Sequence, residues 1–275
     1  MFFLINDRAL LKISGSDSES FLQAQLSNDI GKLDNKSIQF NAYCQHQGKI
    51  LALFWVLRYE DYFFLSFPKE LSDSIEERLQ MFVIISDVKI DNVTSEYTQI
   101  GCDNVTSPNS YRMNDQLSLI IKNSKDCENV EFNSLQIWNK LLIDSNIPEI
   151  FSNTSEKFVP QMLNLDINEL GVNFTKGCYP GQEVVARLHY LGQARRRLFS
   201  FKSEFEMEVG DNLYCASSKA AKARGERYKG SGIVVSKVKY NSLFYCLATL
   251  DTELKDNKIT LNNKHGPILE ILNNE

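Results

Sequence analysis

The sequence has no long apolar run. The longest, ILALFWVL at 50–57, is bounded by Lys49 and Arg58, whereas a helix that crosses a bilayer needs about 20 apolar residues. The first residues, MFFLINDR, carry neither a basic leader nor a small-residue cleavage site, which argues against a secretion signal. We therefore expect a soluble, cytoplasmic chain with no membrane partner.

The sequence also has no Cys-x-x-Cys pair, and its three histidines have no metal-ligand partner at a useful spacing. This argues against a zinc ribbon or a local iron–sulfur loop, and we predict no metal site within the chain. In a chain of this length without an export signal, reduced thiols are expected rather than disulfides. The six cysteines are Cys44, Cys102, Cys127, Cys178, Cys215 and Cys246.

The net charge is small and the charged residues are unevenly distributed. The net charge is −5, but residues 176–230 carry eleven Lys or Arg and six Asp or Glu, which leaves −10 for the rest of the chain. A local positive field can attract a carboxylate-rich ligand, a phosphate or RNA. The alternative is an ordinary solvated face, because the sequence alone does not place these side chains on one surface.

The first part of the chain alternates strand-like and helix-like patterns. Ser16 and Glu19 form an apparent capping box, and the turn at 45–49 with Gly48 predicts a hairpin. The order of elements predicts a ferredoxin-like α+β unit. The expected elements are a strand at 9–14, a helix at 16–26, strands at 38–44, 50–59 and 62–67, a helix at 69–82 and a strand at 83–90.

The pattern changes near residue 195. A polar region at 91–133 with short strands and a helix at 131–144 precede the change. Beyond it, short alternating segments at 198–201, 233–239, 243–249 and 267–272 predict a small β-barrel or sandwich. We therefore divide the chain into an α+β region of two intertwined subdomains, 1–195, and a C-terminal barrel, 196–275. The lysine- and glycine-rich stretch 217–231 is expected to be a mobile loop.

The stretch GVNFTKGCYPGQEVVARLHYLGQARRRL at 171–198 carries the most chemical information. It predicts a short strand at 171–174, a turn, and a helix at 182–191 that begins after Pro180 and Gly181. Cys178 then lies just before a helix N-terminus, with Lys176 two residues away. Both features lower the pKa of a thiol. The alternative is a buried structural cysteine in a tight turn.

The string KGCYPGQEVVAR at 176–187 resembles the signature of the YgfZ family, folate-binding relatives of the glycine-cleavage T-protein that include iron–sulfur assembly factors. Residues 15–30 and 158–174 are similar to the segments that precede this signature in the family. The resemblance implies a three-subdomain ring with a ferredoxin-like folate-binding core, a central channel for tetrahydrofolate and a terminal barrel.

This sequence departs from the T-protein pattern at the positions that carry chemistry. The acidic pair of the aminomethyltransferase falls on Leu51 and Ala52 here, neither of which transfers a proton. Classical aminomethyltransferase activity is therefore not expected. At the pterin, Asp144 keeps an acid one methylene shorter. Met162 replaces a charged residue, and Gln161 is expected to supply amide hydrogen bonds instead.

The resemblance implies a folate-dependent accessory protein for iron–sulfur cluster assembly or repair, which supports iron–sulfur enzymes including tRNA-modifying ones. Cys178 is the candidate functional thiol, and Lys176 would lower its pKa. Gln182 and Glu183 would hold the loop, and Arg187 would bind the folate glutamate tail or anchor the turn. Because one thiol cannot hold a cluster alone, an iron–sulfur client or assembly protein would supply the other ligands.

Two alternatives from other classes remain open. One is a one-carbon transferase that uses tetrahydrofolate on another substrate, although the sequence places no base for it. The other is a tRNA-associated binding protein that uses the basic stretch 176–230, with Tyr179, His189 and Tyr190 stacking on bases. A link to tRNA modification also follows indirectly from the first reading.

Overall fold

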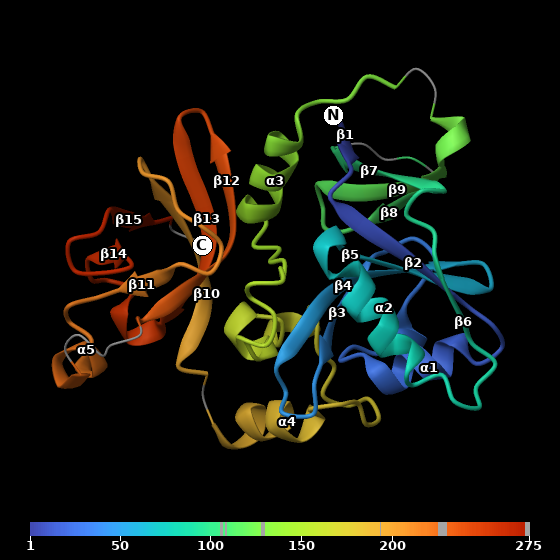
Figure 1. The fold of residues 1–275 in the computed structure, drawn as a ribbon, viewed down its shortest axis with the longest axis horizontal. Helices are drawn as coiled ribbons and strands as arrows, with labels where there is room; N and C mark the ends of the chain where they lie inside the picture. Colours follow the sequence, from blue (N-terminus) through green and yellow to red (C-terminus); the bar gives the residue numbers. More distant parts are fainter. Residues whose placement is uncertain (105–106, 108, 128–129, 193, 225–229, 273–275) are drawn as a thin grey trace.

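The computed structural model describes residues 1–275 except 105–106, 108, 128–129, 193, 225–229 and 273–275. Three β-structures make up the molecule: a five-stranded sheet, a four-stranded sheet and a closed barrel. Figure 1 shows the barrel on one side and the two sheets on the other, with helix α3 (Leu135–Asp144) between them. Of the helices that the structure describes, none has the length and apolar character to cross a bilayer.

The five-stranded sheet has the order β3–β4–β5–β2–β6, and each neighbouring pair is antiparallel. Strand β2 lies between β5 and β6, which is the arrangement of the expected ferredoxin-like unit, and β3 adds one strand at the edge. The elements are β2 (Arg8–Ser14), α1 (Ser18–Gln25), β3 (Gln39–Cys44), β4 (Ile50–Tyr59), β5 (Tyr62–Pro68), α2 (Ser72–Gln80) and β6 (Lys89–Asn92).

The strand predicted at 83–90 is wrong over most of its length. Strand β6 begins only at Lys89, and Ile84 and Ile85 before it are 82% and 97% exposed. Apolar composition alone suggested a strand here. An extended segment, however, needs a neighbour to satisfy its backbone groups, and β6 lies at the sheet edge, where it pairs only with β2.

The predicted capping box is also wrong. The Ser16 hydroxyl donates to the Asp87 carboxylate at 2.9 Å, and Asp17 occupies the N-cap of α1 without a side-chain capping bond. Glu19 instead pairs with Arg58 of β4 at 2.8 Å. Tertiary partners have therefore replaced the local hydrogen bonds that the sequence pattern suggested.

The four-stranded sheet has the order β1–β7–β9–β8 and faces the first sheet across an apolar core that contains Trp55 and Trp138. Helix α3 packs against β1 and against barrel strands β12 and β13. It therefore joins this sheet to the barrel. The strands are β1 (Phe2–Ile5), which the sequence analysis missed, β7 (Tyr97–Asp103), β8 (Ser110–Arg112) and β9 (Leu117–Asn123).

The barrel closes in the order β10–β13–β12–β11–β14–β15. Helix α4 (Gln182–Leu191) precedes it, with the bounds that the sequence predicted. Part of the stretch 217–231 is the helix α5 (Lys219–Arg224) rather than a loop, and 225–229 lie outside the described residues. The strands are β10 (Arg196–Ser203), β11 (Asn212–Tyr214), β12 (Gly232–Tyr240), β13 (Leu243–Asp251), β14 (Ile259–Leu261) and β15 (Ile268–Ile271).

Gly101 on β7 is expected to limit the packing of α3. A Cβ atom at this position would lie 2.7 Å from the Trp138 ring. We predict that Gly101→Ala lowers the free energy of unfolding by about 1–3 kcal/mol, the usual effect of overpacking a core. Urea unfolding measures it. Gly177→Ala is the matched control, because a Cβ there has nothing within 4 Å. Equal stability of the two variants would contradict this packing argument.

Candidate functional site

The loop that carries Cys178 is built on side-chain hydrogen bonds rather than on a strand. The strand predicted at 171–174 is wrong, since these residues form bends and irregular chain. The Asn173 side-chain oxygen accepts hydrogen bonds from the backbone N–H groups of Thr175 and Lys176, at 2.9 and 2.8 Å. The Ser27 hydroxyl donates to the Gly171 carbonyl at 2.5 Å. These bonds fix the entry to the loop against the end of α1.

Lys176 anchors the loop to α1 through a buried ammonium group. Its Nζ donates to the carbonyl oxygens of Gln23, Leu26 and Asn28 at 2.7, 2.5 and 3.0 Å. These carbonyls lie at and beyond the last turn of α1, where backbone acceptors lack partners within the helix. Burial lowers the pKa of Lys176 to about 8, and the charge of Asp29 partly opposes this effect. The effect of Lys176 on the Cys178 thiol stays a prediction.

Two glycines allow the backbone of the loop to contact the hairpin between β3 and β4. Gly181, the N-cap residue of α4, has φ +83°, and Gly48 at the hairpin tip has φ +75°. A Cβ on Gly181 would lie 2.5 Å from the Gln45 carbonyl oxygen and 2.6 Å from the Gly48 Cα. The Gln45–Gly48 backbone bond of 2.8 Å confirms the predicted turn. No side chain fits at position 181.

Cys178 is exposed between two buried anchors. Lys176 and Tyr179 are only 8% and 6% exposed, whereas Gly177 and Cys178 face solvent. The Lys176 Nζ lies 5.4 Å from the centre of the Tyr179 ring. Cys44, Cys102, Cys215 and Cys246 are buried, and Cys127 is partly exposed. Cys178 is therefore the most accessible thiol, and it is not the buried structural cysteine of the alternative reading.

The other expected residues of the motif lie on the first turns of α4. The backbone N–H of Gln182 donates to the Tyr179 carbonyl at 3.1 Å, which closes the turn into the helix. The side chain of Gln182 is half-buried, and those of Glu183 and Arg187 are exposed. All three are accessible on the helix that Cys178 precedes.

Gln161 connects α4 to the barrel. It lies in the 3₁₀ helix η4 (Pro160–Leu163), and its Nε2 donates to the Val185 carbonyl at 2.7 Å. Its own carbonyl accepts from Arg197 of β10 at 2.9 Å, and Arg197 is also paired with Asp166 at 2.5 Å. With 1% exposure, Gln161 is committed to this connection, which the sequence did not suggest.

An open cleft of about 1360 Å³ lies between the segment 164–170 and the barrel. Asp144, the last residue of α3, directly precedes its lining at Ser145, and its carboxylate pairs with Lys140 at 2.6 Å. A neighbouring void of about 10 Å³ is closed by apolar side chains, including Phe40, Leu53 and Pro148. We call the open space the barrel cleft. Its lining includes Asn146, Asn164, Leu170, Arg197, Phe199 and Lys255.

The positions expected to match the T-protein carboxylates are part of the apolar core. Leu51 and Ala52 lie on β4 with 7% and 0% exposure. All residues of 50–57 are described, and none of them is acidic. Residues 50–57 therefore offer no carboxylate for proton transfer.

Most of the described cations in the basic stretch are already paired. Lys176 is held by carbonyls, and four further side chains form ion pairs with acids of the loop at 166 or of the barrel. The stretch is therefore not a continuous positive surface, and Arg227 and Lys229 lie outside the described residues. The pairs are Arg196–Asp251, Arg197–Asp166, Lys202–Glu270 and Lys219–Glu253.

Comparison with known proteins gives relatives along most of the chain. An uncharacterized protein of Haemophilus influenzae is 30% identical over 221 residues, which cover 77% of this chain and 78% of that protein. Proteins named tRNA-modifying protein YgfZ are 26% identical in Colwellia psychrerythraea, covering 84% of this chain and 79% of the relative, and 27% identical in an Enterobacter species, covering 85% and 80%. No family model matches.

Among solved structures, aminomethyltransferase T of the glycine cleavage system from Bartonella henselae is similar, with a TM-score of 0.70 at 12% identity. The match covers 98% of this chain and 84% of the transferase. At this identity the similarity concerns the fold. It confirms the expected T-protein-like architecture with its closed C-terminal barrel.

The buried Lys176 ammonium predicts a pH-dependent stability. The unfolded chain titrates this lysine at its ordinary value of 10.5 and the folded chain at about 8. Between these values the unfolded state binds more protons, so this group makes the fold more stable as pH rises from 8 toward 10.5. We predict that the free energy of unfolding of the wild type, measured in urea, rises relative to that of Lys176→Met from pH 7 to pH 10. Lys258→Met, at an exposed lysine, is expected to show a constant difference. A constant difference for Lys176→Met as well would contradict the buried charge.

Proposed function

Because the chain belongs to the YgfZ family, we propose that it is a folate-dependent accessory protein in the assembly or repair of iron–sulfur clusters. In this role it supports iron–sulfur enzymes, including those that modify tRNA. The tRNA-modifying name of its relatives and its T-protein-like fold support the proposal. The observation that carries it is the exposed Cys178 on a firmly anchored loop.

The geometry of the loop suits a thiol that meets another protein. Cys178 is exposed, and Lys176 and Tyr179 are buried on either side of it. Within the described residues no group of three or more His, Cys, Asp and Glu side chains is placed to hold a metal ion. Iron–sulfur clusters need several thiolate or imidazole ligands. Cys178 therefore contributes one sulfur, and the client or assembly protein contributes the remaining ligands.

The barrel cleft has the groups that a folate requires. Its volume of about 1360 Å³ is ample for a ligand of this size. Phe199 offers a ring for the pterin or aminobenzoate, and Lys255 offers a cation for the glutamate carboxylates. The small apolar void beside Phe40 is too narrow for any of these parts. Tetrahydrofolate, when bound, would supply a carrier for a one-carbon unit.

The barrel cleft and the Cys178 loop are connected through one buried residue. Arg197 lines the cleft and donates to the Gln161 carbonyl, and the Gln161 amide donates to Val185 in α4. Helix α4 begins directly after the loop at Gly181. A ligand that shifts Arg197 therefore acts on the helix that adjoins Cys178.

The two alternatives lack support at the required places. An aminomethyl-type transfer needs a positioned proton acceptor, and Leu51 and Ala52 of β4 are apolar and buried. Direct tRNA binding through 176–230 needs free cations, and five of the nine described cations there, Lys176 among them, already have a partner. Participation through iron–sulfur enzymes accounts for a tRNA-modification role without either property.

The first test concerns the sulfur. Cells that lack their own copy of the protein are complemented with wild type, Cys178→Ala or Cys127→Ala, and the activity of an iron–sulfur tRNA-modifying enzyme is measured. We expect Cys178→Ala to lower the activity to that of uncomplemented cells. Cys127→Ala is expected to behave as wild type, because that partly exposed thiol lies far along the chain from the motif. Full activity with Cys178→Ala would rule out the proposed role of this sulfur.

The second test concerns the cofactor. We expect Lys255→Ala to weaken tetrahydrofolate binding about tenfold in calorimetry, because a hydrogen bond to a charged group contributes about 1.5–3 kcal/mol. Lys258→Ala is the matched control, since Lys258 is also exposed but does not line the cleft. If both variants bind tetrahydrofolate as the wild type does, the folate site is not the barrel cleft.

A further inference from the structure

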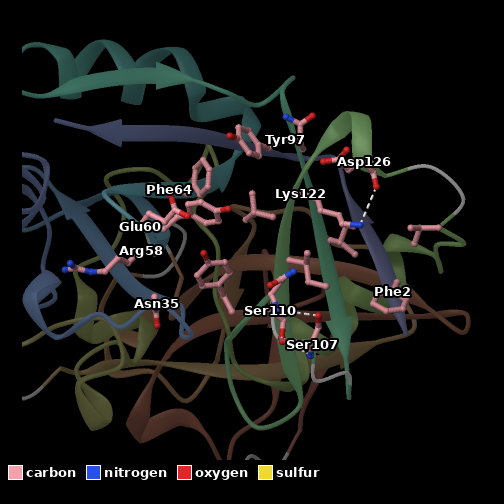
Figure 2. Close-up of a pocket in the computed structure, with 18 residues that line it drawn as sticks. Phe2, Asn35, Arg58, Glu60, Phe64, Tyr97, Ser107, Ser110, Lys122 and Asp126 are labelled. Atoms are coloured by element: carbon pink, nitrogen blue, oxygen red, sulfur yellow. Dashed lines mark hydrogen bonds between the residues drawn. The ribbon is translucent and has the colours of Figure 1, made fainter.

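A second cleft, of about 780 Å³, opens between the four-stranded sheet and the end of β4. We call it the tyrosine cleft. None of its lining residues lines the barrel cleft, and none belongs to the Cys178 loop. Figure 2 shows Arg58, Glu60 and Phe64 on one side of it and Lys122 and Asp126 on the other. The proposed function makes no use of this space.

Aromatic rings form one wall of the tyrosine cleft. Tyr59, Phe64, Tyr97 and Tyr111 all line it. The Phe64 and Tyr97 rings meet edge to face with centres 5.1 Å apart, and the Tyr59 and Phe64 centres are 6.1 Å apart. Tyr62 stacks on Tyr59 from behind at 5.1 Å. Phe64 is fully buried and packs against the rings of Tyr59 and Tyr97, which are exposed and half-buried, respectively, and are the rings open to a planar ligand.

The turn that presents Tyr59 is strained. Tyr59 pairs directly with Tyr62, which leaves Glu60 and Asp61 as a two-residue turn. Glu60 adopts φ +48°, a left-handed conformation that favours Gly or Asn. In the barrel hairpin, Asn241 takes up the same conformation with a suitable side chain. Backbone strain of this kind is concentrated at ligand sites, and here it lies at the mouth of the cleft.

The charges of the described lining balance. Arg58 and Lys122 are its cations, and Glu60 and Asp126 are its acids. Arg58 is further neutralised by an ion pair with Glu19 at 2.8 Å. An anionic ligand therefore gains little here. The polar groups of the lining are amides and hydroxyls, which donate and accept without charge, and they include Asn35, Ser110 and Asn123.

We propose that the tyrosine cleft binds a neutral nucleoside. The base stacks on Tyr59 and Tyr97, and the amide of Asn35 and the amide NH₂ group of Asn123 meet the hydrogen-bonding edges of the base or the ribose hydroxyls. The volume of about 780 Å³ lies within the usual range for small-molecule sites. The balance of charge favours the nucleoside over its phosphate esters.

The experiment is calorimetric titration of the full chain with adenosine, guanosine, cytidine and uridine. We expect at least one of them to bind, and its 5′-monophosphate to bind more weakly. Because stacking of one base on an aromatic side chain contributes about 1–3 kcal/mol, Tyr59→Ala and Tyr97→Ala are each expected to weaken binding about tenfold. Tyr59→Phe keeps the ring and is expected to retain the affinity.

Tyr240→Ala is the matched control, since Tyr240 also ends a strand at a two-residue hairpin turn but lies in the barrel. It is expected to bind as wild type. Lack of binding of all four nucleosides, or an unchanged affinity in Tyr59→Ala and Tyr97→Ala, would overturn the proposal. Cys178→Ala and Lys255→Ala are expected to keep nucleoside affinity, so this result stands or fails separately from the proposed function.

A final arm distinguishes the source of the nucleoside. A single-stranded RNA tetranucleotide that contains the bound base is titrated in the same way. Tighter binding than the nucleoside, with the same dependence on Tyr59, assigns the cleft to a nucleoside unit of RNA. Weaker binding assigns it to the free nucleoside. Both results support the site, and RNA binding that ignores Tyr59 counts against it.

Discussion

The Cys178 loop depends on one buried cation. Transfer of an ammonium group out of water is costly unless its protons are all satisfied, and three carbonyls at and beyond the last turn of α1 accept three hydrogen bonds from Lys176. The same carbonyls would otherwise lack a partner at the end of a short helix. The contact therefore satisfies both the ammonium protons and the carbonyls. It also links residues that are about 150 positions apart, Leu26 and Lys176.

The remaining geometry of the site follows from this anchor. With Lys176 fixed, Tyr179 is buried, Gly181 reaches the hairpin tip at Gly48, and α4 begins in a set direction. Gln161 then joins α4 to Arg197 at the start of the barrel. Contacts from the first sheet, the middle segment and the barrel therefore meet around one surface thiol. Such a thiol keeps its position while it faces a partner.

Elements with strong local patterns were predictable from the sequence. The long apolar run gave β4 with its observed ends, Pro180 and Gly181 marked the start of α4, and Gly48 marked the hairpin. The failures share a physical cause, namely a tertiary partner that local pattern does not contain. The Ser16 hydroxyl donates a hydrogen bond to the Asp87 carboxylate. Ile85, which precedes the edge strand, is exposed to solvent.

For the site, the motif identified the residues but not their tasks. A lysine is expected at the surface, so the burial of Lys176 follows only from the carbonyls that α1 brings to it. The burial of Gln161 follows in the same way from Val185 and Arg197. The accessibility of Cys178 was one of two readings, and only the packing on either side of it decides between them.

The contact between Gly48 and Gly181 restricts how the chain is able to vary. Each residue needs a left-handed backbone. A Cβ on Gly181 would lie 2.6 Å from the Gly48 Cα, and a Cβ on Gly48 would lie 3.1 Å from the Val184 side chain and 3.3 Å from the Gly181 carbonyl oxygen. Because both residues are glycine, a second substitution at the partner position removes no side-chain atom and does not relieve the clash. A side chain at position 181 therefore cannot be accommodated by any change at position 48.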